Sequence, residues 1–475
     1  MIRATTFAGK TVAVFGLGAS GNATVQSLVA GGATVAAWDD SETGRAAAEK
    51  SGFRLVDLSK ADWSTFSSLV LAPGVPLTHP EPHWVVLKAR NAGIEIIGDV
   101  EIFARERAAT CPDAPFIAIT GTNGKSTTTA LIAHILKSVG HDVQMGGNIG
   151  RAVLTLEAPA KDRFHVIEMS SFQIDLTPTL RPTVGVLLNI TPDHLDRHGT
   201  IENYAAVKAR LVQGADIACV GIDDDICIAV LKQRLKVGLA CAFSAGKKLA
   251  PGYSMLGDEI VCSDATGLAV KLGNLAGVAT LRGKHNAQNA LAAISSVREC
   301  LGRMDTKTRL DWQAALSTFP GLAHRMEEIG QLAKPGGKVL FINDSKATNA
   351  DSTEKALLSF PRDVFWIVGG KAKDGGIEPL RQYFPGIVRA YLIGASSEEF
   401  AKTLDGDVAV IQCGTLDVAV AKAAADAASS SATQPVVLLS PACASYDQYK
   451  NFEIRGDAFR ALVSAMPGIE VRVKA

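Results

Sequence analysis

Residues suited to phosphate chemistry gather between positions 117 and 129, in the segment IAITGTNGKSTTT. A β-branched apolar run leads into a glycine-rich turn, and Lys125 and Ser126 open a helical run. Backbone N–H groups at such a turn and helix N-terminus point toward an anion, and Lys125 adds a positive charge. A hydroxyl of Ser126 or Thr127 can hold Mg²⁺. The segment predicts an ATP site, in a short form of the phosphate-loop pattern that has Ile119 where the full pattern has glycine.

A second glycine-rich turn, Gly16–Gly21, follows an apolar run near the N-terminus and precedes a helical one. Asp39 ends the next apolar run, twenty-one residues after Gly18. In dinucleotide-binding folds, glycines at these positions let a pyrophosphate approach the backbone and the acid binds a ribose. The pattern fits an NAD-dependent oxidoreductase, but a second phosphate loop would be surplus for hydride transfer. The same geometry holds any nucleotide diphosphate, and tight strand-to-helix packing is the purely structural alternative.

Acidic and imidazole side chains follow two further apolar runs. Glu168 ends one run, and His194 follows the next, together with Asp193 and Asp196. The carboxyl ends of parallel strands meet at one edge of a sheet, so we expect these side chains beside the phosphate loop. Oxygen ligands suit Mg²⁺, and a position at a strand end favours a ligand role for His194. Lys208, on the helix that follows, has no role that periodicity indicates, and a solvated helix face is its simplest explanation.

Three loops in the last third of the chain also follow apolar runs: Asn343–Asn349, Gly369–Lys373 and Leu439–Asp447. Each carries some combination of lysine, serine, threonine and aspartate. If the runs belong to one parallel sheet, these groups meet at its ligand-binding edge. Lysines together with hydroxyls suit a small substrate with carboxylates. Helix capping by serine or aspartate explains each loop alone, but explains all three together less well.

The elements that must position these residues alternate between strand and helix, which is typical of parallel sheets covered by helices on both faces. We expect an α/β fold. The segment Arg105–Pro115 carries two prolines and is expected to be a loose domain connection, and a small antiparallel patch is expected over residues 240–279. The expected strands are Thr11–Phe15, Thr34–Trp38, Leu69–Leu71, Ile94–Ile96, Phe116–Thr120, His165–Met169, Thr183–Leu188, Ile217–Val220, Val339–Asn343, Phe365–Val368, Val388–Ile393, Val408–Ile411 and Val436–Leu439. The expected helices include Gly21–Ala30, Ala130–Val139, Glu202–Gln213 and Asn286–Leu301.

Composition limits the possible partners. At 475 residues the chain is long enough for about three domains, and 47% hydrophobic residues allow sizeable cores. Lys plus Arg and Asp plus Glu balance at 48 each, so nothing in the charge favours nucleic acid or an anionic membrane surface. The eight cysteines are scattered, which predicts reduced thiols in a cytoplasmic protein, and no apolar run approaches the ~20 residues of a membrane span.

Several motifs, in order and spacing, make the chain resemble the Mur ligase family over its whole length, and within it the members that add D-glutamate. The first of these motifs, Gly121–Thr127, is shared with folylpolyglutamate synthases. The last two motifs and the Rossmann-like N-terminal region are typical of the D-glutamate-adding members. The motifs are Gly121–Thr127, Glu168–Gln173, Thr191–Arg197, Tyr204–Lys208, His285–Ala290, His324–Arg325, Asn343–Asn349 and Leu439–Ser445.

The resemblance implies three domains: a Rossmann-like UDP-substrate domain over 1–110, a central P-loop ATPase-like domain with a mostly parallel sheet over 111–320, and a Rossmann-like amino-acid domain over 321–475. It implies a monomeric cytoplasmic ligase whose partners are small molecules, with no nucleic acid and no membrane. The substrates would be ATP, D-glutamate and a UDP-muramoyl-alanine, joined through an acyl phosphate.

The resemblance also implies roles for individual residues. The UDP-substrate would contact Gly18, Ala19, Ser20, Asp39, Pro73, Gly74 and Asn148. ATP would contact Gly121, Thr122, Asn123, Gly124, Lys125, Ser126, Thr127, Asn289, Arg325 and Asp344. Two Mg²⁺ ions would be held by Ser126, Glu168, His194 and a carbamylated Lys208. The catalytic residues would be Lys125, His194 and Lys208. D-glutamate would be positioned by Lys346, Thr348, Lys373, Ser445 and Phe452.

Departures from the family pattern are small. Members often have Leu-Thr where Ala19 and Ser20 stand, and Leu where Tyr446 stands, which bears on substrate contacts and not on the chemistry. Two rival functions lead to different expectations. A folylpolyglutamate synthase would lack the opening UDP-binding domain, and an NAD-dependent oxidoreductase would use the second phosphate site only as an accessory.

Overall fold

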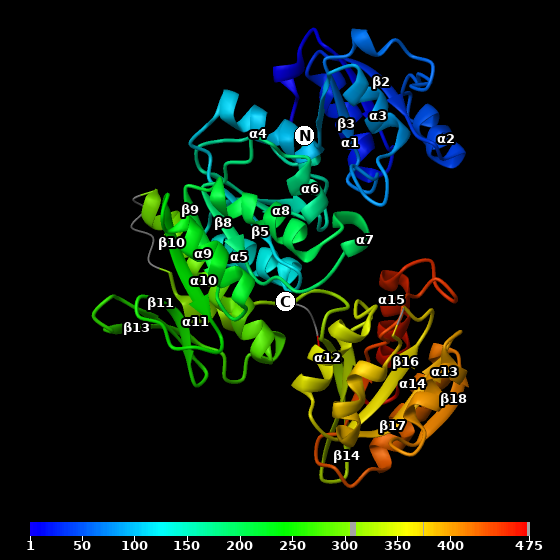
Figure 1. The fold of residues 1–475 in the computed structure, drawn as a ribbon. Coiled ribbons are helices and arrows are strands. Elements are labelled where there is room, and N and C mark those ends of the chain that lie inside the picture. The colour runs from blue at the N-terminus through cyan, green and yellow to red at the C-terminus, as the bar shows by residue number, and fades with distance from the viewer. Residues whose placement is uncertain (305–309, 374, 473–475) are drawn as a thin grey trace. The chain divides into compact units, whose positions relative to one another are not determined.

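Three sheets follow one another along the chain in the computed structural model, which describes residues 1–304, 310–373 and 375–472 (Figure 1). Contacts divide the chain into two compact units. The first comprises residues 1–276 and 286–317, and the second comprises residues 277–285 and 318–475. The first unit holds two of the sheets and the second unit holds the third.

The N-terminal sheet has four parallel strands in the order β2-β1-β3-β4, which is a doubly wound order with its switch point between β1 and β3. Its strands are β1 (Thr11–Phe15), β2 (Thr34–Trp38), β3 (Ser68–Leu71) and β4 (Glu95–Ile97). Its helices are α1 (Ala19–Ala30), α2 (Glu42–Lys50) and α3 (Trp84–Asn91). The central strands β1 and β3 are almost wholly buried because helices cover both faces of a parallel sheet.

The prediction of a loose connection over Arg105–Pro115 is wrong for its first half, because α4 (Asp99–Thr110) runs through it. The carboxylate of Glu106 accepts hydrogen bonds from Thr5 and Thr6, so this face of the helix is tied to the N-terminus. Both prolines of the segment lie beyond the end of the helix. Proline composition alone therefore placed the irregular segment too early.

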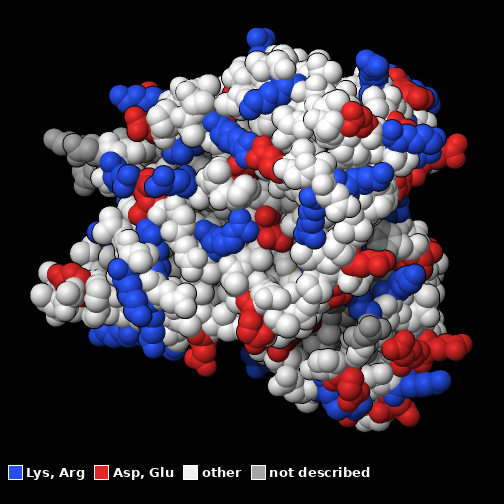
Figure 2. Space-filling model, turned by 45° about the horizontal axis from the view of Figure 1, so that its top comes forward, with Lys and Arg blue, Asp and Glu red and all other residues white. Residues whose placement is uncertain are grey.

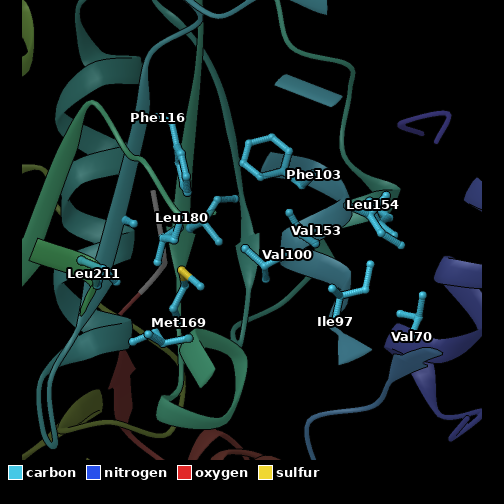
Figure 3. Close-up of a cluster of buried hydrophobic side chains, with 14 of the residues drawn as sticks. Val70, Ile97, Val100, Phe103, Phe116, Val153, Leu154, Met169, Leu180 and Leu211 are labelled. Carbon is cyan, nitrogen blue, oxygen red and sulfur yellow. The ribbon is translucent and has the colours of Figure 1, made fainter. Parts of the chain in front are cut away.

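Apolar side chains of α4 belong to a core that spans the first two sheets (Figure 3). Val100 and Phe103 lie between Val70 of β3 on one side and Phe116 and Met169 of the central domain on the other. All five are at most 3% exposed. Because this apolar core is shared by both sheets, the first two sheets form one compact unit.

The central sheet has nine strands in the order β13-β12-β11-β10-β9-β8-β5-β7-β6. Its strands are β5 (Phe116–Thr120), β6 (Asp142–Gly147), β7 (Arg163–Glu168), β8 (Val184–Leu187), β9 (Ile217–Gly221), β10 (Leu239–Ser244), β11 (Gly252–Leu256), β12 (Glu259–Ser263) and β13 (Ala269–Asn274). The strands from β6 to β11 pair in parallel, and β12 and β13 add antiparallel pairs. The expected antiparallel patch is therefore part of the same sheet. Its first strand, β10, pairs in parallel with both of its neighbours, β9 and β11.

Helices α5 to α9 connect strands of the central sheet and place loops at their carboxyl ends, and α10 and α11 follow its last strand. They are α5 (Lys125–Ser138), α6 (Ser171–Asp175), α7 (Leu195–His198), α8 (Ile201–Gln213), α9 (Asp225–Arg234), α10 (Lys284–Arg303) and α11 (Trp312–Ser317). β8, β5 and β7 are neighbours, so the phosphate loop after β5 lies between the loops that follow the other two strands. This adjacency is what the sequence predicted for Glu168 and His194.

The third sheet has seven strands in the order β18-β17-β16-β19-β15-β14-β20. Its strands are β14 (Glu327–Lys334), β15 (Gly337–Asn343), β16 (Val364–Gly369), β17 (Ile387–Ile393), β18 (Val410–Gly414), β19 (Val436–Leu439) and β20 (Ile469–Val471). Its helices are α12 (Ala350–Ser359), α13 (Ser397–Leu404), α14 (Leu416–Ser429) and α15 (Phe452–Ser464). β16, β19 and β15 are adjacent and parallel, so the three predicted loops do lie at one edge.

Acidic and basic side chains are interspersed over the face shown in Figure 2, which agrees with the zero net charge. Among the residues that the structure describes, no helix combines the length and apolarity that a membrane span needs.

Candidate functional site

The phosphate loop connects the buried strand β5 to the N-terminus of α5. Gly124 takes a left-handed conformation with φ of 86° as the N-cap of that helix. A Cβ atom there would collide with the side-chain oxygen of Asn289 on α10, so glycine is required on both counts. Ser126 follows in the first turn of α5 and is 7% exposed. The loop and helix end thus form the cradle that the sequence predicted for a phosphate.

Two lysines converge on one carbonyl group of this loop. Lys125 Nζ donates to Gly121 O at 3.0 Å and to Thr122 O at 2.8 Å. Lys208 Nζ, from α8, donates to the same Gly121 O at 2.8 Å and to Thr120 Oγ1 at 3.2 Å. Two ammonium groups sharing one acceptor repel each other, and an anionic partner would relieve this repulsion.

Lys208 is buried, so the solvated helix face that was its simplest explanation from the sequence is wrong. It is 1% exposed, and its ammonium lies 4.7 Å from the centre of the Tyr204 ring. Burial holds the pKa of Lys208 well below its ordinary value, and the charge of Lys125 acts in the same direction. Asp193 and Glu168 oppose this shift, so both carboxylates act electrostatically on the amine. The amine is thereby biased toward its neutral, nucleophilic form.

Glu168 ends β7 and is 1% exposed. Its Oε1 accepts a hydrogen bond from Asn148 Nδ2 at 2.8 Å. Its Oε2 is buried and has no hydrogen-bond partner among the described residues. A buried carboxylate oxygen without a partner is costly, and binding a cation would remove that cost.

The donor set around this oxygen fits magnesium better than a softer metal. Among the described residues, no group of three or more His, Cys, Asp and Glu side chains is placed to hold a metal ion. Mg²⁺ commonly takes one or two carboxylates and completes its shell with phosphate oxygens and water. Glu168 Oε2 can supply a carboxylate oxygen to such a partial set.

His194 begins the short helix α7 in a left-handed conformation with φ of 52°. Its ring Nε2 lies 3.5 Å from Asp193 Oδ2, and its side chain is half exposed. Burial lowers the pKa of His194 against the opposing effect of Asp193, and the charges of Lys125 and Lys208 lower it further. A neutral imidazole is the form that can bind a metal. The structure therefore brings four predicted residues, Lys125, Glu168, His194 and Lys208, into one electrostatic neighbourhood.

A cluster of aromatic rings beside this site, two of them buried, has no counterpart in the sequence predictions. His198 stacks on Phe172, with ring centres 5.3 Å apart and planes at 6°, and it also contacts Tyr204. Its Nε2 lies 2.8 Å from Ser171 Oγ. Burial lowers the pKa of His198 to about 4, so this ring is a neutral support for the loop at neutral pH.

Side-chain amides brace the phosphate loop from its far side. Asn189 Oδ1 accepts from the backbone N–H of Asn123, and Asn189 Nδ2 donates to Gln288 Oε1 on α10. On the same helix, Asn289 Oδ1 accepts from Thr128 Oγ1 at 3.3 Å. The family resemblance predicts an ATP role for Asn289 but none for Asn189 or Gln288, because amides have no spacing signal of their own.

Thr122 is predicted to contact ATP, yet its hydroxyl already has protein partners. Thr122 Oγ1 donates to Thr191 O at 3.1 Å and accepts from Thr191 N at 3.0 Å. It also lies 3.3 Å from Tyr204 Oη. These bonds tie the phosphate loop to the loop that carries His194.

In the N-terminal domain, Gly18 is the N-cap of α1, and Ala19 and Ser20 occupy its first turn. Ser20 and Pro73 line one small hollow at the carboxyl ends of β1 and β3. Asp39 Oδ2 accepts from Leu17 N at 2.6 Å, so this acid holds the turn and still has lone pairs for a ligand. The predicted UDP residues thus meet at one edge, with one exception: Asn148 lies beside Glu168 in the central domain.

A direct contact links the predicted UDP site to the loop of the central site. Arg197, three residues after His194, donates from Nη1 to Gly74 O at 3.0 Å. Its guanidinium also lies 4.6 Å from the centre of the Phe172 ring.

In the second unit, Lys346 and Phe452 lie together, with the Lys346 ammonium 4.0 Å from the ring centre. Thr348 is bonded locally, through its backbone N–H, to Lys346 O. An isolated bridge pairs Lys371 with Ala444, and thereby brings the loop of Lys373 beside that of Ser445.

Arg455 is a residue of this second unit that the sequence did not indicate. It is 1% exposed and donates to Ser345 O at 2.9 Å and to Cys443 O at 3.0 Å. It therefore joins the loop of Lys346 to the loop of Ser445. Burial lowers its pKa to about 10. A single arginine within a helix carries no sequence signal that marks it as a connector of loops.

Asp344 lies at the carboxyl end of β15 and is 7% exposed. Its Oδ2 accepts from Ser440 Oγ at 2.8 Å. Burial raises the pKa of Asp344 to about 7, although these hydrogen bonds and the charge of Arg325 oppose the rise. The two residues predicted to contact ATP from this domain are therefore electrostatic neighbours.

Known proteins resemble this chain in sequence over its whole length. The Mur ligase middle domain model matches residues 119–297, and the model of the Mur ligase MurD-like N-terminal domain matches residues 10–98. A protein of Brucella abortus named UDP-N-acetylmuramoylalanine–D-glutamate ligase is 55% identical over 470 residues, which cover 99% of this chain and 98% of that protein. A protein of the same name from Nitrobacter hamburgensis is 57% identical over 473 residues, with 99% of each chain covered.

Solved structures share the fold at lower identity. UDP-N-acetylmuramate-alanine ligase from Thermotoga maritima is 17% identical, with a TM-score of 0.55, and the match covers 95% of this chain and 98% of that one. MurF ligase from the same organism, solved in complex with ADP, is 15% identical, with a TM-score of 0.55 and 97% of each chain covered. The three sheets are thus the three-domain architecture of these ligases. The resemblance inferred from the motifs is confirmed, and the chain belongs to the Mur ligase family.

Proposed function

We propose that this chain is an ATP-dependent ligase that joins D-glutamate to UDP-N-acetylmuramoyl-L-alanine, with ADP and phosphate as products. The observation that carries the proposal is the meeting of Lys125, Lys208 and Glu168 at one phosphate loop. The substrates are those named for relatives that are 55% and 57% identical over nearly the full length. The reaction belongs to the synthesis of peptidoglycan precursors.

The chemistry requires ATP because a carboxylate is a poor electrophile. In the first step, the carboxylate of UDP-N-acetylmuramoyl-L-alanine attacks the γ-phosphorus of ATP, ADP leaves, and an acyl phosphate forms. The neutral amine of D-glutamate then attacks the acyl carbon, and phosphate leaves. Two anions must approach in the first step, so Lys125 at the phosphate loop would offset their repulsion.

The described residues also fit magnesium, which would neutralise phosphate charge when it is bound. Ser126 and Glu168 would hold one ion, and the buried, unpartnered Oε2 of Glu168 supports this assignment. His194 and a carbamylated Lys208 would serve a second ion. Asn148, which donates to Glu168 Oε1, would orient that carboxylate.

Carbamylation of Lys208 is supported by its environment. A neutral amine adds to CO₂ and releases a proton, which leaves a carbamate anion on Nζ. Burial biases Lys208 toward the neutral amine. The carbamate would place an anionic oxygen ligand beside the ammonium group of Lys125.

The other predicted contacts complete the proposal. The start of α1 would take the UDP diphosphate, with Asp39 at the nucleoside and Pro73–Gly74 nearby. The lysines of the C-terminal loops, Lys346 and Lys373, would bind the carboxylates of D-glutamate, with Thr348, Ser445 and Phe452 beside them. Asn289, Arg325 and Asp344 would contact ATP. All eight cysteines are free thiols, which supports action in the cytoplasm.

Phosphate release with defined substrates tests the proposal. We expect release from ATP only when both D-glutamate and UDP-N-acetylmuramoyl-L-alanine are present. Turnover with a folate in place of the UDP-substrate, or a change in NADH absorbance, would instead favour the rival functions. L-glutamate is the matched control, because it carries the same charges and differs only in configuration.

A further inference from the structure

A cavity of about 600 Å³ lies in the first unit, where β10 and β11 separate. These strands pair at only two positions, Phe243 with Tyr253 and Ser244 with Ser254. On its other side, β10 pairs with β9 from Leu239 onward. The preceding part of β10 therefore has a paired edge toward β9 and an open edge toward the cavity.

The walls are mostly apolar, and the side chains of β10 are small here, which leaves the space open. Ala240, Cys241 and Ala242 line the cavity along the strand, and Leu231 of α9 lines it from the neighbouring helix. Larger residues on β10 would fill the space. A cavity of this volume with apolar walls is within the usual range of small-molecule sites.

Polar groups gather on the α10 side of the cavity. Tyr253 Oη donates to Glu299 Oε1 at 2.7 Å, so this carboxylate already has a partner. The guanidinium of Arg298 lies 5.9 Å from the centre of the Tyr253 ring. Arg298 makes no ion pair with any residue that the structure describes. The side chain of Arg298 hydrogen-bonds to Cys262, and the charge of Glu299 also acts on it. The cavity therefore offers apolar walls and one guanidinium that has no ion-pair partner among the described residues.

This cavity is separate from the phosphate loop. Both involve α10, but Asn289, which touches the loop residue Thr128, lies nine residues before Arg298. Nine residues of helix span about 14 Å. A ligand in the cavity would thus leave the loop open to ATP.

We propose that this cavity is a second ligand site, which binds a small amphipathic anion whose apolar body lies against Leu231 and Ala240 and whose acidic group meets Arg298. The site rests on residues that the ligase reaction does not use, so it stands or fails independently of the proposed function. Carboxylates of medium-length aliphatic chains and aromatic sulfonates share the required chemistry.

Fluorescence of anilinonaphthalene sulfonate tests the site in the full-length protein, with saturating ADP and Mg²⁺ present to occupy the nucleotide site. We expect one saturable site per chain that decanoate displaces. Arg298→Leu should weaken probe and decanoate binding about tenfold, the scale of one charge-assisted hydrogen bond. Ala240→Phe, which adds a ring at a wall position, should abolish binding. Arg303→Leu is the matched control, because Arg303 lies on the same helix and pairs with Asp216 instead.

The ratio of decanoate to decanol affinity provides a second readout. A folding defect would weaken binding of both ligands and leave this ratio unchanged. The parent should bind decanoate about tenfold more tightly than decanol, and Arg298→Leu should bind both about equally. Equal losses in Arg298→Leu and Arg303→Leu would overturn the proposal. Probe binding that is seen only when ADP is left out would also overturn it, because the probe would then occupy the nucleotide site.

Discussion

Replacement of Lys208 by methionine separates the catalytic role of this residue from its structural one. The change removes hydrogen bonds to Thr120 Oγ1 and Gly121 O and the contact with the Tyr204 ring. Together these contacts are worth about 2–4 kcal/mol. Methionine restores apolar packing and removes a buried amine, so we expect a net loss of no more than about 2 kcal/mol. Ligase activity, in contrast, should fall by at least about a thousandfold, because the carbamate is lost.

The pH dependence of stability provides the sharper result. The pKa of Lys208 in the folded state lies well below its unfolded value, so between these two values the unfolded chain binds more protons. Stability contributed by Lys208 therefore rises with pH across that window, by up to about 1.4 kcal/mol per pH unit. In carbon-dioxide-free buffer, the free energy of unfolding of the parent should therefore increase with pH relative to that of Lys208→Met.

Urea unfolding at a series of pH values measures this difference. Lys232→Met is the matched control, because Lys232 is an exposed lysine on α9, and its replacement should leave the pH dependence unchanged. A ¹³C spectrum with labelled bicarbonate should show a carbamate signal in the parent and none in Lys208→Met. A pH-independent difference would refute the reasoning about burial, and normal turnover by Lys208→Met would refute the catalytic role.

Three further changes have defined outcomes. Gly124→Ala should reduce ATP affinity at least about a hundredfold, measured by calorimetry, because a Cβ there collides with Asn289 and the backbone is left-handed; unchanged affinity would contradict the described loop. The folded pKa of Asp344 is raised to about 7 from 3.8, so its stabilising effect is full below pH 3.8 and is lost as pH rises toward 7. Asp344→Asn should remove that loss, measured by urea unfolding from about pH 4 to 7, and an unchanged slope would contradict the assignment. Asn148→Ala should raise the Mg²⁺ concentration for half-maximal activity about 10–100-fold, because Glu168 loses its orienting donor. An unchanged Mg²⁺ requirement would contradict the proposed orienting role of Asn148.

Much of the fold could be predicted from the sequence because buried parallel strands have continuous runs of apolar residues. The bounds of β5 and β19 agree with the expected strands to the residue, and both strands are fully buried. β14 was missed because its polar and charged residues, in EEIGQLAK, do not form an apolar run. β6 was missed because it ends in two glycines, which usually mark turns.

The candidate site could be predicted where a residue type stands at a strand end, and could not where its role depends on tertiary contacts. Glu168 was found because parallel strands place their carboxyl ends at one edge. The burial of Lys208 could not be predicted, because it depends on β5 lying beside α8 in space. Arg455 was missed for the same reason, since its partners come from two distant loops.

Transfer of oxygen from substrate to phosphate tests the central claim most directly. UDP-N-acetylmuramoyl-L-alanine labelled with ¹⁸O in its alanyl carboxylate is incubated with ATP, Mg²⁺ and D-glutamate, and the released phosphate is analysed by mass spectrometry. An acyl-phosphate route predicts one ¹⁸O atom in each phosphate and an amide-linked D-glutamyl product. Unlabelled phosphate alongside that product, or no product at all, would contradict the account.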